Sequence, residues 1–373
     1  MKIIIAPDKF KGALSARKVA TAMAAGARQV FPEATIIQRP LADGGEGSLE
    51  VLRDVFALQA QRLQVTGPLR RPVAAEYLLG NGQAFIEVAQ ACGLQHVPPT
   101  RRHPRNTTTI GVGELIEDAL ARGAHTISLF LGGSATNDAG AGMAATLGYR
   151  FFSDQGHDFI PMADSLEWTV RIDREKVLSA LKKAKIFGVC DVNNPLIGPQ
   201  GATYTYALQK GAKQKELATL ERNMEYFAGR INDWLDVDVR DLPGAGAAGG
   251  LGAGIIAFLG GALRPGIELI MEAVGFDTLV ANADLVLTGE GSIDEQTPHG
   301  KVVSGIASRA RSAGAKTIAL AGRCVLEEPK RALPNVDRVA ALMDMPGMTL
   351  AQAMAETDRL LEELTEKVLR EFK

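Results

Sequence analysis

The segment 131–143 combines glycines with hydroxyl and carboxylate side chains, a composition suited to holding an anion. It reads Leu-Gly-Gly-Ser-Ala-Thr-Asn-Asp-Ala-Gly-Ala-Gly-Met and directly follows a predicted strand. Its small residues let a phosphate approach the backbone N–H groups, and Ser134 and Thr136 add hydroxyl donors. Asp138 has the chemistry of a metal ligand. A tight turn also uses glycines, but it rarely needs so many beside three polar side chains.

Two further segments each place a pair of carboxylates after a predicted strand. The first, Asp-Gly-Gly-Glu-Gly, supplies Asp43 and Glu46; the second, Leu-Thr-Gly-Glu-Gly-Ser-Ile-Asp, supplies Glu290 and Asp294. Open α/β sheets bind ligands at the carboxyl ends of their strands, so both pairs are candidates for contacts with a metal ion or a substrate. Acidic loops also serve solubility, and that alternative stays open.

Charged residues also follow two other predicted strands. Asp8, Lys9 and Lys11 come after the first strand and offer one carboxylate and two ammonium groups, which suit an anionic ligand. Asp191 follows an apolar strand at 186–190 and precedes Val-Asn-Asn-Pro, so we expect it at the carboxyl edge of a sheet. A turn or capping aspartate would give the same pattern.

A fourth glycine-rich segment, 243–252, contains Gly-x-Gly-x-x-Gly, which taken alone indicates a dinucleotide-binding fold. Its context weakens that interpretation, because residues 237–241 are too charged for a central strand and Glu268 lies in a helical pattern. We expect a glycine-rich helix start that packs closely or faces a phosphate, with nicotinamide binding as the alternative.

Other catalytic motifs are missing from the sequence. Gly300-Lys301 is followed by Val302 and lacks the earlier glycine of a P-loop. The five histidines and three cysteines do not have the spacing of a zinc site. Ser134 does not lie in Gly-x-Ser-x-Gly, so a hydrolase nucleophile elbow has no support.

The length of 373 residues is typical of two domains. With 41 Lys and Arg against 43 Asp and Glu, the net charge of −2 gives no basic excess for nucleic acid or a membrane surface. Every apolar run is shorter than the roughly 18 residues of a membrane span. Sparse cysteines and a short apolar N-terminal run without a cleavage site predict a cytoplasmic protein.

Short β-branched runs alternate with stretches of helical period, a pattern typical of parallel sheets covered by helices. The predicted strands are 2–6, 35–38, 84–88, 126–131, 186–190, 285–287, 317–321 and 338–342. The predicted helices follow Ser15 and Ser48 and cover 111–121, 213–234, 255–259 with the glycines before it, 268–281, 302–312 and the C-terminus from about 349.

Turn residues at 67–72 indicate a crossing between domains. We therefore expect residues 1–70 and 285–373 to form one doubly wound α/β domain of the Rossmann or flavodoxin type. Residues 71–284 are expected to form a second, inserted α/β domain. Glycine loops, carboxylates and a few cations, without a zinc or nucleophile motif, predict an enzyme that handles phosphate.

Six motifs, in order, resemble those of the type I glycerate kinases of bacteria. They are Ile-Ala-Pro-Asp-Lys-Phe-Lys-Gly-Ala-Leu-Ser-Ala (5–16), Ala-Asp-Gly-Gly-Glu-Gly (42–47), Gly-Gly-Ser-Ala-Thr-Asn-Asp (132–138), Cys-Asp-Val-Asn-Asn-Pro-Leu (190–196), Pro-Gly-Ala-Gly-Ala-Ala-Gly-Gly (243–250) and Thr-Gly-Glu-Gly-Ser-Ile-Asp (288–294). The resemblance implies ATP-dependent phosphorylation of D-glycerate with Mg²⁺, usually at the 2-hydroxyl. It also implies two α/β domains with the active site in the cleft between them.

These observations lead to a set of expected site residues. The expected catalytic residues are Asp191 as the base, Lys11 for charge neutralisation and Asp43; the cofactor-binding residues are Gly132, Gly133, Ser134, Thr288 and Gly289; the substrate-binding residues are Asp8, Lys9, Glu46 and Asp294; and the metal ligands are Glu290 and Asp138. The alternatives are a kinase for another small hydroxy acid, a nicotinamide-dependent dehydrogenase and a catalytically silent nucleotide-binding regulator.

The chain departs from the family pattern at three places. Residues 206–212 read Tyr-Ala-Leu-Gln-Lys-Gly-Ala where the family often has Phe-Gly-Pro-Gln-Lys-Gly-Ala, so a Gly-Pro turn is lost at Ala207 and Leu208. Ser292 replaces a common arginine, and Arg323 stands where a serine is frequent. These changes affect expected nucleotide contacts near 206–210 and phosphate contacts near 292.

Overall fold

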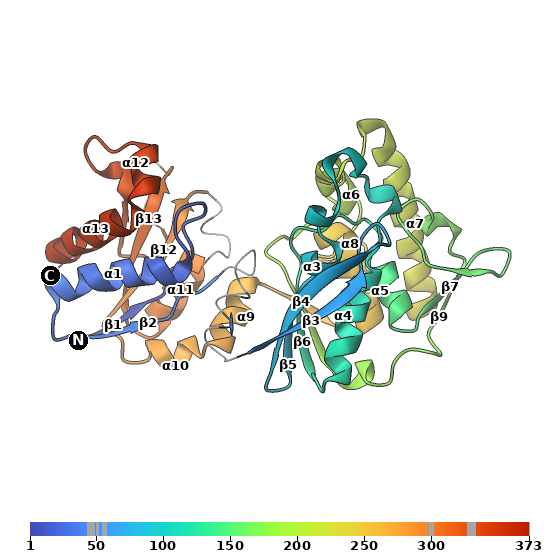
Figure 1. Ribbon diagram of the computed structural model, residues 1–373, viewed down its shortest axis with the longest axis horizontal. Helices are drawn as coiled ribbons and strands as arrows, with labels where there is room; N and C mark the ends of the chain where they lie inside the picture. Colours follow the sequence, from blue (N-terminus) through green and yellow to red (C-terminus); the bar gives the residue numbers. More distant parts are fainter. Residues whose placement is uncertain are drawn as a thin grey trace. The chain divides into compact units, whose positions relative to one another are not determined.

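The computed structural model describes residues 1–42, 49, 52–53, 58–295, 297, 302–326 and 333–372. The chain divides into two compact units: unit 1 contains residues 1–55 and 265–373, and unit 2 contains residues 56–264 (Figure 1). Both units are α/β structures, so the predicted fold class is confirmed. The segments around Asp43, Glu46 and the helix expected after Ser48 lie outside the described residues.

The boundaries between the units differ from the predicted positions at 70 and 284. Strand β3 (Gln59–Thr66) pairs antiparallel with β4 (Pro72–Gly80) in the sheet of unit 2. Residues 67–71 are therefore a hairpin turn, closed by a hydrogen bond from Gly67 N to Arg71 O of 2.7 Å. At the other boundary, α9 (Gly266–Ala273) and α10 (Phe276–Val280) contact α11 (Val302–Ser312) of unit 1.

Unit 1 has a five-stranded parallel sheet in the order β14-β13-β12-β1-β2. The strands are β1 (Lys2–Ile5), β2 (Thr35–Gln38), β12 (Leu285–Ile293), β13 (Lys316–Cys324) and β14 (Arg338–Ala341). Helices α1 (Ala16–Val30) and α13 (Thr357–Phe372) cover one face, where they pack on Ile3 and Ile5 (Figure 1). Side chains alternate along a strand, so other residues of β12 and β13 point to the opposite face, where α11 packs.

The strand order of unit 1 reverses between β1 and β12. From β1 the chain proceeds through α1 to β2 on one side, and from β12 it proceeds through α11 to β13 and β14 on the other. Such a reversal leaves a crevice at the carboxyl ends of the two central strands, where α/β proteins bind ligands. Strands β12 and β13 continue past the end of β1, which pairs only with residues 285–287 of β12.

Unit 2 has a six-stranded sheet in the order β11-β10-β6-β5-β4-β3. Its four parallel strands are β5 (Gln83–Glu87), β6 (Thr126–Phe130), β10 (Lys185–Val189) and β11 (Ala262–Arg264). Its helices are α3 (Ala89–Cys92), α4 (Ile110–Ala121), α5 (Ala141–Thr146), α6 (Ala202–Tyr206), α7 (Leu217–Leu235) and α8 (Ala247–Leu259). A small antiparallel sheet contains β8 (Asp158–Phe159), β7 (Arg150–Phe152) and β9 (Arg171–Asp173).

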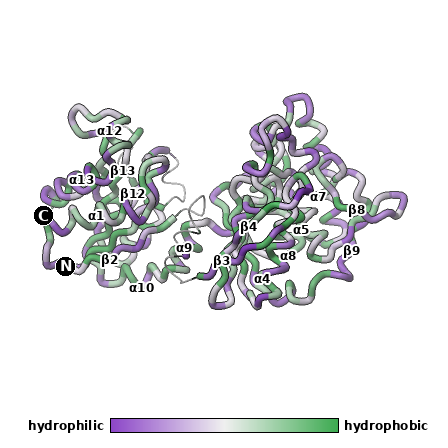
Figure 2. Tube along the Cα trace, in the orientation of Figure 1, coloured by the Kyte–Doolittle hydropathy of each residue, from purple (hydrophilic) through white to green (hydrophobic). Residues whose placement is uncertain are grey.

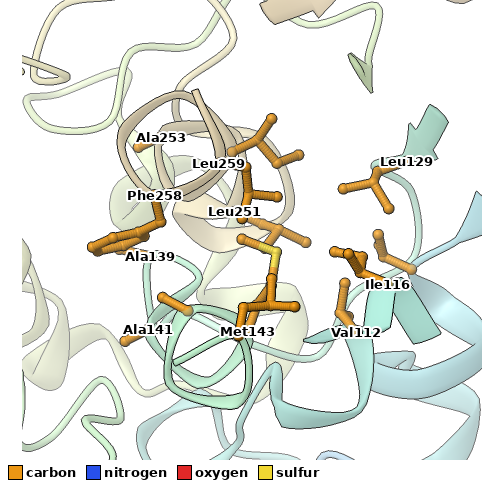
Figure 3. Close-up of a cluster of buried hydrophobic side chains, with 14 of the residues drawn as sticks. Val112, Ile116, Leu129, Ala139, Ala141, Met143, Leu251, Ala253, Phe258 and Leu259 are labelled. Atoms are coloured by element: carbon orange, nitrogen blue, oxygen red, sulfur yellow. The ribbon is translucent and has the colours of Figure 1, made fainter. Parts of the chain in front are cut away.

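The core of unit 2 anchors the segment that follows β6. Figure 3 shows Ala139, Ala141 and Met143 among apolar side chains of α4, α8 and β6, such as Val112 and Leu251. All of these side chains are buried. Figure 2 shows hydrophobic residues along β4 and hydrophilic residues in the loop that leads to β8. The apolar packing therefore holds the polar loop 132–138 from its C-terminal side.

Most predicted elements are present, and the differences have local causes. The helix predicted at 268–281 is interrupted at Gly275 and becomes α9 and α10. The C-terminal helix is likewise divided, into α12 (Leu350–Ala355) and α13. The antiparallel strands β3, β4 and β7–β9 were not predicted. Within the described residues, no helix is long and apolar enough to cross a membrane.

Candidate active site

Unit 1 has a cavity of about 510 Å³ at the reversal of strand order. The loop after β1 contributes Asp8, Lys9 and Lys11, and β12 contributes Glu290, Ser292 and, just after its end, Asp294. Arg323 comes from β13, and Leu350 and Met354 of α12 form part of an apolar wall. The structure therefore brings five of the predicted site residues, Asp8, Lys9, Lys11, Glu290 and Asp294, into one cavity.

The loop after β1 is held to the sheet by its backbone. Asp8 N donates to Gly289 O at 2.8 Å, and Phe10 is buried, with its N–H donating to Leu14 O at 2.9 Å. The Asp8 carboxylate accepts a hydrogen bond from Lys9 N at 2.6 Å. These contacts fix the position of two basic side chains, Lys9 and Lys11, at the rim of the cavity.

The carboxylates on β12 lie on one face of the strand. Glu290, Ser292 and Asp294 are two residues apart, so their side chains project to the same side. Glu290 is only 8% exposed and accepts a hydrogen bond from Thr297 Oγ1 at 2.8 Å. The same hydroxyl accepts from Asp294 N at 3.0 Å. Thr297 thus links the two predicted acidic residues.

Arg323 and Ser292 are direct partners across two parallel strands. The register of β12 and β13 pairs Ser292 with Arg323, and Arg323 Nε donates to Ser292 Oγ at 3.0 Å. Both residues line the same cavity. Ser292 and Arg323, which both depart from the family pattern, are therefore neighbours. The arginine has moved from the position of residue 292 to that of residue 323, and a guanidinium group remains beside Glu290 and Asp294.

Thr288 and Gly289, predicted to bind a cofactor, are buried in the sheet. Thr288 Oγ1 donates to Ala6 O at 2.9 Å, and this bond ties β12 to the end of β1. Neither residue presents a surface to a ligand in unit 1. We therefore propose a packing role for both residues in place of cofactor contact.

The predicted phosphate loop of unit 2, Gly132–Ser134, follows β6 and is fixed at its two ends. Leu131 N donates to Val189 O at 2.9 Å, and Ala135 N donates to Cys92 O at 2.8 Å. Gly132 and Gly133 are exposed, and a Cβ on Gly132 would meet no atom within 4 Å. Gly133 has a φ of 70°, which favours glycine. The loop thus exposes a backbone that a phosphate can approach.

Lys210, which the sequence analysis named only as part of the segment 206–212, lies beneath this loop. Lys210 is 3% exposed, and its Nζ donates to Thr136 O at 2.7 Å and to Ser134 Oγ at 3.2 Å. Burial lowers the pKa of Lys210 to about 8. Nothing in the local sequence marked it, because the 3₁₀ turn Leu208–Lys210 is far from residue 134 along the chain. Lys210 is buried although the Gly-Pro turn of the family pattern is absent at Ala207 and Leu208.

Asp138 was predicted as a metal ligand, and the structure gives it a different environment. Its carboxylate is fully buried and accepts hydrogen bonds from Thr109 N and Thr109 Oγ1, both at 2.9 Å, and from Gly140 N at 3.2 Å. Burial raises the pKa of this carboxyl group. Because these donors occupy its oxygens, we propose that Asp138 shapes the loop and does not hold a metal ion.

Asp191 lies at the same sheet edge as the phosphate loop. It is exposed and comes two residues after β10, whose last residue, Val189, pairs with Phe130 of β6. The turn that follows is held by Asn194, which donates to Gln200 O at 2.7 Å and accepts from Tyr206 Oη at 2.6 Å. Tyr206, at a position where the family often has phenylalanine, therefore adds a bond to this turn.

The glycines at 244–252 pack closely against the phosphate-loop segment. Ala139 N donates to Gly249 O at 3.2 Å, and a Cβ on Gly249 would overlap the carbonyl oxygen of Thr136. This contact accounts for the glycines without a dinucleotide. The neighbouring thiols are also unsuited to catalysis, because burial raises the pKa of Cys92 to about 12 and that of Cys190 to about 11.

No three His, Cys, Asp or Glu residues gather into a metal-binding cluster within the described ranges. Mg²⁺ usually takes one or two protein carboxylates and completes its shell with water and phosphate oxygens. Glu290 and Asp294 supply oxygen ligands of this kind on one face of β12. The described residues therefore fit a magnesium site that depends on substrate phosphates.

The comparisons with known proteins agree with the α/β fold. The model of the glycerate kinase family matches residues 3–373. The chain belongs to the glycerate kinase family, whose members are phosphotransferases.

Two curated relatives and one solved structure are similar over most of their length. A glycerate kinase of Halalkalibacterium halodurans is 43% identical over 98% of this chain and 97% of its own. A glycerate 2-kinase of Escherichia coli K12 is 44% identical over 86% of this chain and 85% of its own. A crystal structure described as a glycerate kinase 2 from Salmonella typhimurium LT2 has a TM-score of 0.88 and 40% identity, covering 100% of this chain and 98% of that one.

Proposed function

We propose that this protein transfers the terminal phosphoryl group of ATP to D-glycerate, with Mg²⁺ and with 2-phosphoglycerate as the favoured product. The observation that carries the proposal is the exposed glycine loop Gly132–Ser134, which lies above the buried ammonium group of Lys210. Family membership supports the same reaction class. A phosphate group suits this loop because backbone N–H groups and a cation can both contact its oxygens.

The cavity of unit 1 supplies groups that suit the acceptor and the metal ion. D-glycerate carries a carboxylate, which the cations Lys9, Lys11 and Arg323 complement. Glu290 and Asp294 would hold Mg²⁺, which when bound offsets the charge of the nucleotide phosphates. Asp43 and Glu46 remain candidates for catalysis and substrate binding, respectively.

Asp191 is the proposed general base. Phosphoryl transfer needs a carboxylate that orients the acceptor hydroxyl and accepts its proton. Asp191 is exposed at the carboxyl end of β10, next to the strand that precedes the phosphate loop. The turn after Asp191 is held by hydrogen bonds of Asn194 and Tyr206, so the backbone that carries the carboxylate is fixed in position.

A direct assay tests the proposed function against its alternatives. The protein is incubated with D-glycerate and Mg·ATP, and phosphoglycerate and ADP are measured; other small hydroxy acids and NAD with each acid form parallel arms. Phosphoglycerate formation is expected only with D-glycerate and ATP. Turnover of another acid points to a different hydroxy-acid kinase, nicotinamide reduction to a dehydrogenase, and inactivity in every arm to a regulator.

Substitution of Gly132 by valine is expected to abolish nucleotide binding and to leave the fold intact. A Cβ at this position enters open space, so the protein can accommodate it, but the branched side chain occupies the volume that a phosphate needs. Calorimetric titration with ATP measures the effect, and thermal unfolding serves as the control. Unchanged ATP affinity in a folded Gly132→Val variant would contradict the phosphate loop. Gly133→Val is a poorer test, because its positive φ adds strain.

Exchange of the cross-strand pair is expected to conserve glycerate binding. Arg323→Ser should raise the KM for glycerate by about tenfold or more, since a hydrogen bond to a charged group contributes about 1.5–3 kcal/mol. The double variant Ser292→Arg with Arg323→Ser returns the guanidinium to the neighbouring strand and should recover most of the affinity. Steady-state kinetics of the two variants decide the matter. A double variant no better than Arg323→Ser would show that the side-chain position on β13 itself is required.

A further inference from the structure

Lys210 is buried beneath the phosphate loop. Among the residues that the structure describes, its hydrogen bonds go only to uncharged oxygens, Ser134 Oγ and Thr136 O. Asp138 attracts the ammonium group by charge interaction, but no hydrogen bond joins the two in the described part of the chain. Burial of an ammonium group without a hydrogen-bonded counter-ion is costly, so an anion bound at the loop would stabilise the ammonium form of Lys210.

The hydroxyl of Ser134 connects this ammonium group to the loop. Because Ser134 Oγ accepts a hydrogen bond from Lys210 Nζ, its own O–H remains available to donate a hydrogen bond elsewhere. Ser134 is 4% exposed and directly follows the exposed Gly132 and Gly133. An acceptor at the loop would receive a hydrogen bond from this hydroxyl, and the ammonium group would strengthen that bond by polarising the hydroxyl.

We propose that Lys210 is a positioning residue that acts through Ser134 to bind a phosphate group at the Gly132–Ser134 loop. This inference rests on the proposed function. The phosphate belongs either to ATP or to the phosphorylated product, and both present the same oxygens. Lys210 does not touch the phosphate itself; it orients and polarises the serine hydroxyl and supplies the buried charge.

The charged surroundings of Lys210 define how the site responds to pH. Burial lowers the pKa of Lys210 to about 8, whereas Asp138 and Cys92 raise it by charge interaction. The Cys92 thiol is itself neutral below its raised pKa. The lowered pKa brings the neutral form of Lys210 within reach in the free protein, whereas a bound phosphate favours the ammonium form. Phosphate binding should therefore take up protons from the buffer at a pH near or above the pKa of Lys210 in the free protein.

The first experiment measures this proton uptake in the unaltered protein. ATP and 2-phosphoglycerate are titrated separately by calorimetry at a series of pH values on both sides of the lowered pKa, in two buffers of different ionisation enthalpy at each pH. Uptake with one of the two ligands supports the inference and identifies the source of the phosphate. Lys215→Met, which removes an exposed lysine, should leave the uptake unchanged. Absence of uptake with both ligands overturns the inference.

The second experiment is a double-mutant cycle on Lys210 and Ser134. Lys210→Met should weaken binding of the identified ligand by about 10- to 100-fold, and Ser134→Ala by a smaller factor of roughly 2 to 10. The double variant should bind no more weakly than the weaker-binding of the two single variants, because Lys210 acts through the hydroxyl of Ser134. Additive losses, or wild-type affinity in a folded Lys210→Met, overturn the inference.

The Gly132→Val variant separates failure of this inference from failure of the proposed function. If Gly132→Val abolishes phosphate binding and Lys210→Met does not, the loop holds the phosphate and only the role of Lys210 is refuted. If neither substitution changes the binding of ATP or 2-phosphoglycerate, the loop is not the phosphate site and both proposals fail.

Discussion

Asp191→Asn is expected to lower kcat by roughly 10² or more while ATP affinity changes little. A positioned general base contributes about 10²- to 10⁴-fold in rate, and asparagine keeps the size of the side chain but cannot accept the proton. The site favours this outcome because Asp191 is exposed at the end of β10, beside the turn that Asn194 and Tyr206 hold.

The effect of Asp191→Asn is measured by steady-state kinetics and by calorimetric titration with ATP. Loss of kcat with unchanged affinity identifies a base. Loss of ATP affinity instead makes Asp191 a metal ligand, and retention of most of kcat makes Asp43 or Asp294 the better candidate for the base. Asp154→Asn is a matched control, because Asp154 is exposed in the loop before β8, in the same unit and away from the sheet edge.

Removal of divalent cations is expected to abolish turnover altogether. The cavity of unit 1 offers three cationic side chains, Lys9, Lys11 and Arg323, but it also holds the carboxylates Glu290 and Asp294. A triphosphate beside these carboxylates needs added positive charge. Activity should disappear in excess EDTA and return in full when Mg²⁺ exceeds the chelator.

A second readout separates a metal requirement of the protein from that of the nucleotide. Glu290→Gln should shift the Mg²⁺ concentration for half-maximal activity upward at saturating Mg·ATP, because it removes one ligand charge. Full turnover in EDTA would contradict the metal proposal outright. An unchanged Mg²⁺ requirement in Glu290→Gln would leave the metal bound by the nucleotide and remove Glu290 from the site.

The sequence predicted the parallel strands well because their apolar runs are short, β-branched and followed by turn residues. It also placed Asp8, Lys11 and Glu290 after two predicted strands, which the fold makes neighbours, and all three residues line one cavity. The hairpin of β3 and β4 was missed because β3 contains three glutamines and an arginine among its eight residues, and because the Gly-Pro turn between the strands resembles a linker.

Burial was the other property that the sequence did not supply. Asp138 and Thr288 have the residue types of ligands, and the structural roles proposed for them rest on their buried hydrogen bonds, which the sequence does not reveal. Lys210 is the opposite case, because a lysine among polar neighbours is usually exposed. Its burial depends on contacts with residues more than 70 positions earlier in the chain.

Because Ser292 pairs with Arg323, the two residues form one cross-strand pair, and sequence variation in this sheet can be followed pair by pair as well as position by position. A residue-by-residue comparison counts two replaced positions, one losing a charge and one gaining it. In the structure, the cross-strand pair still consists of one hydroxyl group and one guanidinium group, and only the strands that carry them are exchanged. We therefore expect replacement of both paired residues together to preserve binding, and replacement of one residue alone to weaken it.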